Sequence, residues 1–175
     1  MRVDPGTSVG GGVSSGRGKD WYDTAQICTS GHVINSCSIS MPHLNRNFCE
    51  RCGAPTITEC PYQGCHSIIR GEFQASSSFT RPSFCSDCGQ PYPWTEAKIK
   101  AAQELADELD NLSLQEREML KRSLDDIVKD SPQTTVAATR FKKLAAKAGK
   151  VAADGFRDIL VDVLSEATKR IIWPK

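Results

Sequence analysis

The sequence lacks several features that would assign it to a broad functional class. None of its apolar runs approaches the length of a membrane-spanning helix. It has no HExxH or Walker motif, and no Gly-Lys-Ser/Thr follows the glycine run at 10–12. The formal net charge is +1, so the whole chain carries no nucleic-acid signature. We therefore expect a protein that neither spans a membrane nor catalyses a reaction.

Large apolar side chains are also in short supply. Only 7% of the 175 residues are aromatic and 39% are hydrophobic. Residues 1–20 are rich in Gly and Ser, carry no secretory signal, and are expected to form a disordered tail. A chain of this length has room for one or two small domains. A core this modest needs further stabilisation, and bound metal can provide it.

Cysteine, by contrast, is abundant and concentrated. All eight cysteines and all three histidines lie between Cys28 and Cys88. Four of the cysteines form two CxxCG patterns, at 49–53 and 85–89. Such a knuckle is a tight turn that directs two thiolates at one ion, and its glycine supplies the positive φ that the turn needs. Two knuckles predict two zinc sites in series, each in a ribbon of short β-hairpins.

Each knuckle needs a second pair of ligands from another hairpin. For Cys85 and Cys88, the upstream pair is Cys60 and Cys65. Four ligands around Zn²⁺ close a structural site and leave no position for substrate. The alternative of a disulfide framework is disfavoured, because CxxCG pairs are typical of metal sites. The zinc-deaminase pattern, which needs a His-x-Glu before Pro-Cys-x-x-Cys, is absent.

The ligand pair that completes the other site is less clear. Cys49 and Cys52 require Cys28 together with either His32 or Cys37. The Cys28-x₃-His32 spacing puts two ligands on one short turn, and we favour it. Cys37 would instead give each site four thiolates. The chain is thus predicted to bind two zinc ions. The remaining histidines, at 43 and 66, are expected to be polar loop residues.

The second half of the sequence is helical in pattern. A first helix is expected to begin at Thr95, just after Trp94, which should pack on the base of the ribbons. Ser113-Leu114-Gln115-Glu116 is a capping box that starts a second helix. Ser131, followed by a proline, is expected to cap a third. The last helix should run from about 152 to 172.

The apolar stripe of that last helix predicts self-association. It is too wide for one thin neighbour to cover, and we expect residues 132–172 to form a homo-oligomer. Packing within the chain, or contact with a membrane surface, are alternatives. The stripe comprises Phe156, Ile159, Leu160, Val163 and Leu164.

Basic residues crowd the third helix. Lys143, Lys147 and Lys150 follow helical spacing and would share one face, with Arg140 close by. Such a run is usually a solvated face, or it could meet the acidic segment at 96–131. It is also the candidate nucleic-acid-binding surface, although no aromatic residues interleave with it.

Together these patterns predict a small α+β protein. The expected organisation is a tail at 1–20, tandem zinc ribbons at 21–94 and an all-α region at 95–175. The charge of the ribbons disfavours phosphate binding, because residues 20–95 contain six acids and four bases.

The ribbon half resembles an uncharacterised bacterial family, domain of unknown function 2321. The likeness rests on residues 22–28 (YDTAQIC), Gly31-His32-Val33-Ile34-Asn35 and Phe48-Cys49-x-x-Cys52-Gly53-Ala54. It continues in Cys60-Pro61, Ile69-Arg70-Gly71, Pro82-Ser83-Phe84-Cys85-x-x-Cys88-Gly89 and Pro91-Tyr92-Pro93-Trp94-Thr95. The resemblance implies tandem zinc ribbons, a helical C-terminus and His32 as the ligand. It implies no activity. This chain departs from the family's CPxC-type knuckle at Cys60, since the second cysteine here is Cys65.

Two functions remain compatible with the sequence. The first is a non-catalytic adaptor, whose ribbons bind a protein partner and whose helices self-associate. The alternative is an accessory protein that binds nucleic acid through the basic third helix. Zinc-binding thiols imply a reducing compartment, so a cytoplasmic location is expected.

Overall fold

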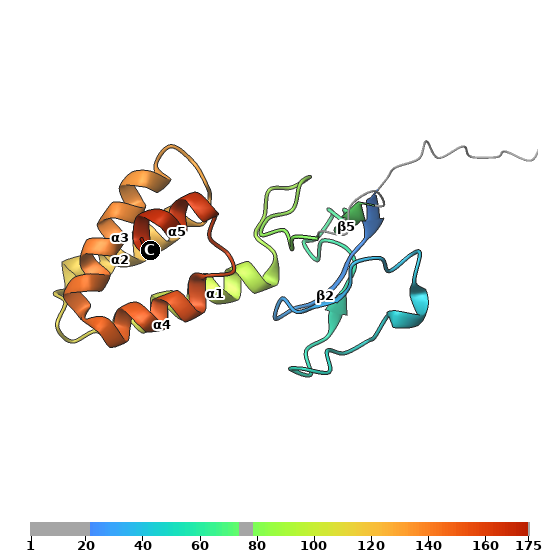
Figure 1. The fold of residues 1–175 in the computed structure, drawn as a ribbon, viewed down its shortest axis with the longest axis horizontal. Coiled ribbons are helices and arrows are strands. Elements are labelled where there is room, and N and C mark those ends of the chain that lie inside the picture. Colours follow the sequence, from blue (N-terminus) through green and yellow to red (C-terminus); the bar gives the residue numbers. More distant parts are fainter. Residues whose placement is uncertain (1–21, 74–78, 175) are drawn as a thin grey trace, which may run out of the picture.

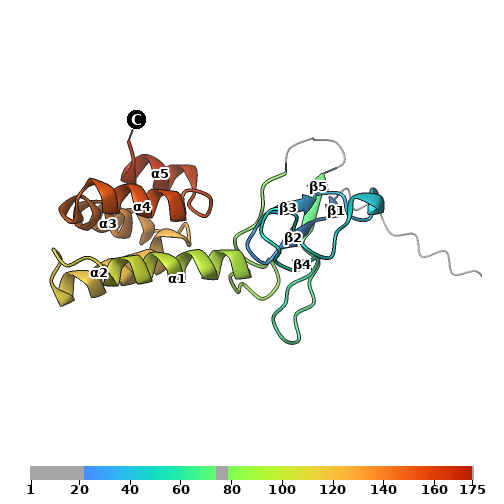
Figure 2. The ribbon, with the colours of Figure 1, turned by 90° about the horizontal axis from the view of Figure 1, so that it is seen from below.

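The computed structural model describes residues 22–73 and 79–174, so the expected tail at 1–20 lies outside them. Within these ranges the N-terminal half contains short antiparallel strands and the C-terminal half contains five α-helices. The two halves lie at opposite ends of the molecule, and α1 leads from one to the other (Figures 1 and 2). The small α+β fold class is confirmed.

The strands form two small sheets. β1 pairs with β5 in one sheet, and the other has the order β3-β2-β4, all antiparallel. The elements are β1 Tyr22–Thr24, β2 Gln26–Cys28, β3 Val33–Asn35, the 3₁₀ turn η1 Pro42–Leu44, β4 Thr56–Ile57 and β5 Arg70–Phe73. Ala25, Ile27 and Ile69 are fully buried between them. Strands this short have a core of few side chains, so their hairpins need another source of stability.

The five helices pack on one another around a second core. They are α1 Pro93–Asp107, α2 Leu114–Ile127, α3 Thr134–Ala148, α4 Lys150–Leu160 and α5 Glu166–Ile172. This core contains Leu120, Leu124, Phe141 and Phe156, none of which is exposed to solvent. The rings of Phe141 and Phe156 meet edge to face, with centroids 5.2 Å apart. These contacts hold α3 and α4 together.

Two of the predicted helix starts were wrong and one is confirmed. The capping box at Ser113 and Glu116 is present at the start of α2. α1 begins two residues before Thr95, because Pro93 suits the first position of a helix. Thr95 is instead buried, and its hydroxyl donates to the Ser83 carbonyl at 2.9 Å. α3 begins only at Thr134, whose hydroxyl oxygen accepts a hydrogen bond from the Ser131 backbone.

The prediction of a single last helix was also wrong. The chain turns after Leu160 and starts again at Glu166, with Ser165 as the N-cap of α5. The Ser165 hydroxyl accepts from the Thr168 backbone N–H at 3.3 Å. This turn folds α5 back against α3. Two short helices can therefore cover apolar surface that one straight helix would have left open.

The apolar stripe consequently lies inside the monomer. Phe156 and Leu160 are fully buried, and Val163 and Leu164 are each 5% exposed. Only Ile159 is partly exposed, and it still packs against the core. The premise that the stripe needs a second subunit to cover it was wrong, because neighbouring helices of the same chain already cover it.

The start of α1 joins the two halves. Trp94 is 1% exposed and packs with the buried residues of the ribbons, as predicted. Its indole N–H donates to the Pro82 carbonyl at 2.8 Å, and its ring stacks on Tyr92. The Arg81 guanidinium lies over the same ring and donates to the carbonyl of Gly31. These contacts fix the ribbons against the first turn of the helical half.

Candidate metal centres

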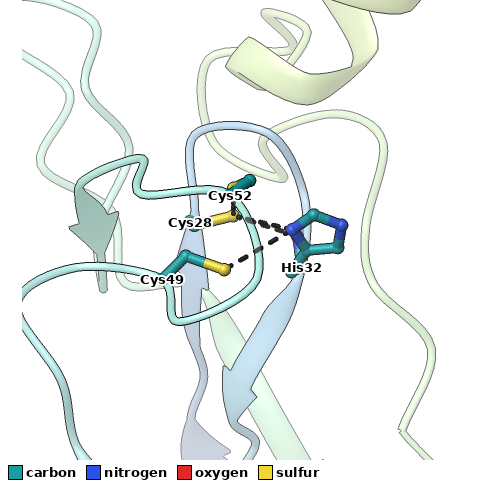
Figure 3. Close-up of side chains that lie close together, drawn as sticks. All are labelled: Cys28, His32, Cys49 and Cys52. Atoms are coloured by element: carbon teal, nitrogen blue, oxygen red, sulfur yellow. Dashed lines mark hydrogen bonds between the residues drawn. The ribbon is translucent and has the colours of Figure 1, made fainter.

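The first cluster of potential ligands comes from two hairpins. Cys28 is the last residue of β2, and His32 immediately precedes β3 on the other side of a tight turn. Cys49 and Cys52 come from the knuckle that leads into β4. Figure 3 shows the three sulfurs and the imidazole facing one another. Their ligand atoms all lie within 4.8 Å of each other.

The distances in this cluster match those around one zinc ion. Cys28 Sγ lies 3.6 Å from His32 Nδ1 and 3.8 Å from Cys52 Sγ, and Cys49 Sγ lies 3.5 Å from His32 Nδ1. Zinc bonds of about 2.3 Å to sulfur and about 2.0 Å to nitrogen put tetrahedral sulfurs about 3.8 Å apart, and a sulfur and a nitrogen about 3.5 Å apart. The four side chains thus have the spacing of a tetrahedral metal site.

The second cluster has the same shape and four thiols. Cys60 Sγ lies 3.7 Å from Cys88 Sγ, and Cys65 Sγ lies 3.6 Å from Cys85 Sγ. All four sulfurs fall within 4.8 Å of one another. The longer Cys-x₄-Cys loop therefore brings both of its thiols to the site. No cysteine of the chain forms a disulfide.

The two knuckles have the same backbone hydrogen bonds. In each knuckle, the backbone N–H of the first cysteine donates to the carbonyl of the residue five positions later, which is Ala54 in the first knuckle and Gln90 in the second. The backbone N–H of the glycine donates to the carbonyl of that first cysteine. Gly53 and Gly89 have φ of 71° and 70°. The repeat extends to FCxxCGxP, because Phe48 bridges to Pro55 and Phe84 to Pro91. The flanking Phe and Pro were a signal that could have been read from the sequence.

Backbone N–H groups favour the thiolate form of one cysteine in each knuckle. The Ala54 N–H, followed by the Ser30 hydroxyl, lowers the pKa of Cys52 to about 6. Burial raises the pKa of Cys85, but the N–H groups of Cys88 and Asp87 outweigh it and lower that pKa to about 6. Because the thiolate is the metal-binding form, each knuckle presents one ligand that is readily ionised near neutral pH.

Cys37 lies in different surroundings. Its sulfur is 3.6 Å from the Glu72 carboxylate, and Ser36 donates to the same carboxylate at 2.9 Å. Burial raises the pKa of Cys37, with a further contribution from Glu72. A neutral thiol beside a carboxylate is a poor metal ligand. Of the two alternatives for the first site, the structure brings His32 and not Cys37 to the three thiols.

The basic residues predicted on the third helix lie on two helices. α3 ends at Ala148, and Lys150 belongs to α4, so the expected shared face of Lys143, Lys147 and Lys150 was wrong. Lys147 pairs with Glu116 of α2 at 2.6 Å. Arg140 is on α3 at helical spacing from Lys143 and Lys147, and it lines a groove beside α2. The break at Gly149, which has a φ of 99°, separates the set.

Comparison with known proteins identifies the family. A family model described as "Uncharacterized protein conserved in bacteria (DUF2321)" matches residues 21–172. The chain belongs to this family. The match extends the resemblance seen in the ribbons across all five helices of this DUF2321 protein. No curated protein and no solved structure matched the chain. Among its described residues, no helix is both long and apolar enough to cross a membrane.

Proposed function

We propose that this DUF2321 protein is a non-catalytic zinc-binding adaptor that holds two zinc ions and recognises a protein partner through its ribbons. One observation carries the proposal: two groups of four potential ligands, each with its ligand atoms within 4.8 Å of one another. Imidazole with three thiolates, and four thiolates, are both common donor sets of structural zinc. The ligand sets are Cys28, His32, Cys49 and Cys52, and Cys60, Cys65, Cys85 and Cys88.

The ligand count supports the proposal that the zinc sites are not catalytic. Catalytic zinc sites keep an open position for water or substrate beside three protein ligands. Here each group supplies four, so zinc would be saturated by the protein. Bound zinc would instead stabilise hairpins whose own core is small, since binding energy of a structural metal contributes to folding. Thiolate ligands also require a reducing compartment, for which we propose the cytoplasm.

A protein partner is favoured over nucleic acid by charge. The ribbons carry more acids than bases, six against four over residues 20–95. The basic residues of the helical half are divided between helices, and Lys147 is engaged by Glu116. A phosphate-binding surface would need several clustered, unpaired bases.

Elemental analysis of protein purified without chelator tests the metal. We expect two zinc per chain, one in Cys49→Ser and one in Cys85→Ser, because each substitution removes one ligand set. Zero or one zinc in the wild type, or iron in place of zinc, would contradict the proposal. A salt titration of binding to random DNA tests the partner class, since phosphate contacts give a steep salt dependence. We expect no measurable binding at physiological salt.

A further inference from the structure

The two FCxxCGxP knuckles differ in what covers them. Phe84, which precedes the second knuckle, is half-buried and packs against the core of the helical half. Phe48 occupies the matching position before the first knuckle and is 63% exposed. The local backbone is the same in both, so the difference lies in the neighbour: the second ribbon has the helices beside it and the first does not. The chain itself thus shows one way in which such a knuckle is covered.

The exposed phenylalanine adjoins, along the chain, a groove that it does not itself line. Cys49, the next residue, lines a groove of about 300 Å³ between β3, η1 and the first knuckle. Val33 and Leu44 line the same groove and are 45% and 42% exposed. Exposed apolar side chains gathered in this way are typical of interaction sites, whereas single ones are not.

Charge around the groove indicates what kind of partner would fit. Three charged residues line it, and the Arg46 guanidinium pairs with Glu50 at 3.3 Å. Arg51 has no carboxylate within ion-pairing distance in the part of the chain that the structure describes. An occupant with an acidic side chain would neutralise Arg51, and arginine beside apolar contacts is a frequent centre of binding energy.

We propose that the first-knuckle surface, formed by Phe48 and the adjoining groove that Val33, Leu44 and Arg51 line, docks an amphipathic α-helix of a partner protein that carries an acidic residue beside its apolar face. A helix is inferred because helices cover the equivalent Phe84 in this chain. The mode is helix-in-groove recognition, read by apolar side chains at helical spacing. This inference rests on the proposed adaptor function and assigns its binding surface.

A second copy of the chain is a less suitable occupant. One exposed apolar groove of the helical half is lined by Leu114 and Met119, together with Glu118, Arg122 and Arg140. Neither of these arginines is ion-paired in the described residues. Bringing the two grooves together would set unpaired arginines against one another, which disfavours head-to-tail association.

The experiment selects binders from a displayed library of 16-residue random peptides, using the full zinc-loaded chain. Binders are then measured against Phe48→Ser and Arg51→Glu, with Ile68→Ser as the matched control. Ile68 is 57% exposed but belongs to the second ribbon. We expect peptides with apolar residues at i, i+3 or i+4, and i+7 and at least one Asp or Glu. Phe48→Ser should weaken them about tenfold or more, as for a hot spot, and Ile68→Ser should not.

Each other result would overturn the inference. Basic or uncharged consensus peptides would contradict the inferred acidic residue of the partner, and extended peptides would contradict its helical conformation. Arg51→Glu should shift the preference of the chain towards lysine-bearing peptides. Dimerisation of the wild type that Phe48→Ser abolishes would identify a second copy as the occupant. Peptides that bind wild type and Phe48→Ser equally would move the site elsewhere and leave the adaptor function standing. Two zinc per variant chain verifies that the substitutions leave the ribbons folded.

Discussion

His32 and Cys37 follow each other closely in the chain but meet different partners. His32 lies on the turn that closes the β2-β3 hairpin, where its backbone N–H donates to Cys28 Sγ at 3.2 Å. Cys37 follows β3, where its backbone N–H donates to the Asn35 side chain and its thiol turns to Glu72. A short strand therefore separates a residue at the metal cluster from one that supports the sheet edge.

The first prediction separates the roles of these two residues. His32→Ala should lower zinc affinity of the first site by more than about 100-fold, since even changes to groups that only orient a ligand cost roughly 10–100-fold. Cys37→Ser should leave it unchanged. Competition with a chromophoric chelator measures both affinities, and the second site provides an internal control. Weaker binding in Cys37→Ser alone would reverse the assignment.

A second prediction concerns the carboxylate of Glu116. The Lys147 side chain, and then the Ser113 backbone N–H, lower the pKa of Glu116 from 4.5 to about 2. The ionised carboxylate therefore stabilises the fold above pH 4.5, and this contribution disappears as the pH falls through about 2. Glu116→Gln should be less stable than wild type at pH 7, and the difference should vanish near pH 2.

Urea unfolding followed by helical circular dichroism measures this pH dependence. Lys147→Met serves as the control, because it removes the other partner of the ion pair. The stability of this variant should therefore depend less on pH than that of wild type between pH 4.5 and about pH 2. Acid release of the proposed zinc ions should affect all three proteins alike. A difference between Glu116→Gln and wild type that stays constant from pH 7 to pH 2 would show that the ion pair is not its cause.

At the scale of elements, the turns determine where the chain changes direction and where each helix ends. Both knuckles keep the same hydrogen bonds although only their Phe, Cys, Gly and Pro residues agree. Among the helices, a turn capped by Ser165 divides the last helix, which the apolar periodicity shows as continuous. Periodicity reports which side chains are buried but not the turn at which the chain changes direction, and that is why the last helix was predicted too long.

The third prediction tests where the stripe of α4 is buried. Phe156→Ala should destabilise the helical half by about 3–5 kcal/mol, because it removes a fully buried ring that packs on Phe141. Val151→Ala, on the same helix, changes a side chain that is 89% exposed and should cost within about 0.5 kcal/mol. Chemical denaturation measures both values. Equal, small losses would mean that Phe156 does not contribute to the core of the monomer.

The whole molecule contains two cores of different origin. Ala25, Ile27, Ile69 and Trp94 belong to the ribbon core, whereas the helical core draws its buried residues from Ala102 onwards. Phe84 and the first turn of α1 connect them. The ribbon core is small and adjoins both clusters, so its stability should depend on metal far more than that of the helices.

The fourth prediction is that chelation unfolds only one half. Removing zinc should abolish the near-ultraviolet signal of the buried Trp94 and make the ribbons sensitive to protease, while most helical circular dichroism remains. Re-addition of zinc should restore both properties. Loss of the helical signal together with the ribbon signal would show that the two cores fold as one unit.

The sequence by itself determined the chemistry of this protein. Two CxxCG knuckles and the cysteines upstream of them predicted two clusters, and apolar residues at helical spacing predicted a helical half, because both patterns act locally. Only the tertiary structure decided that His32 rather than Cys37 meets the thiols, that the stripe around Phe156 is buried in the monomer, and that Phe84 is covered while Phe48 is exposed. Each of these depends on which distant segments lie side by side, and no local pattern of residues encodes that arrangement.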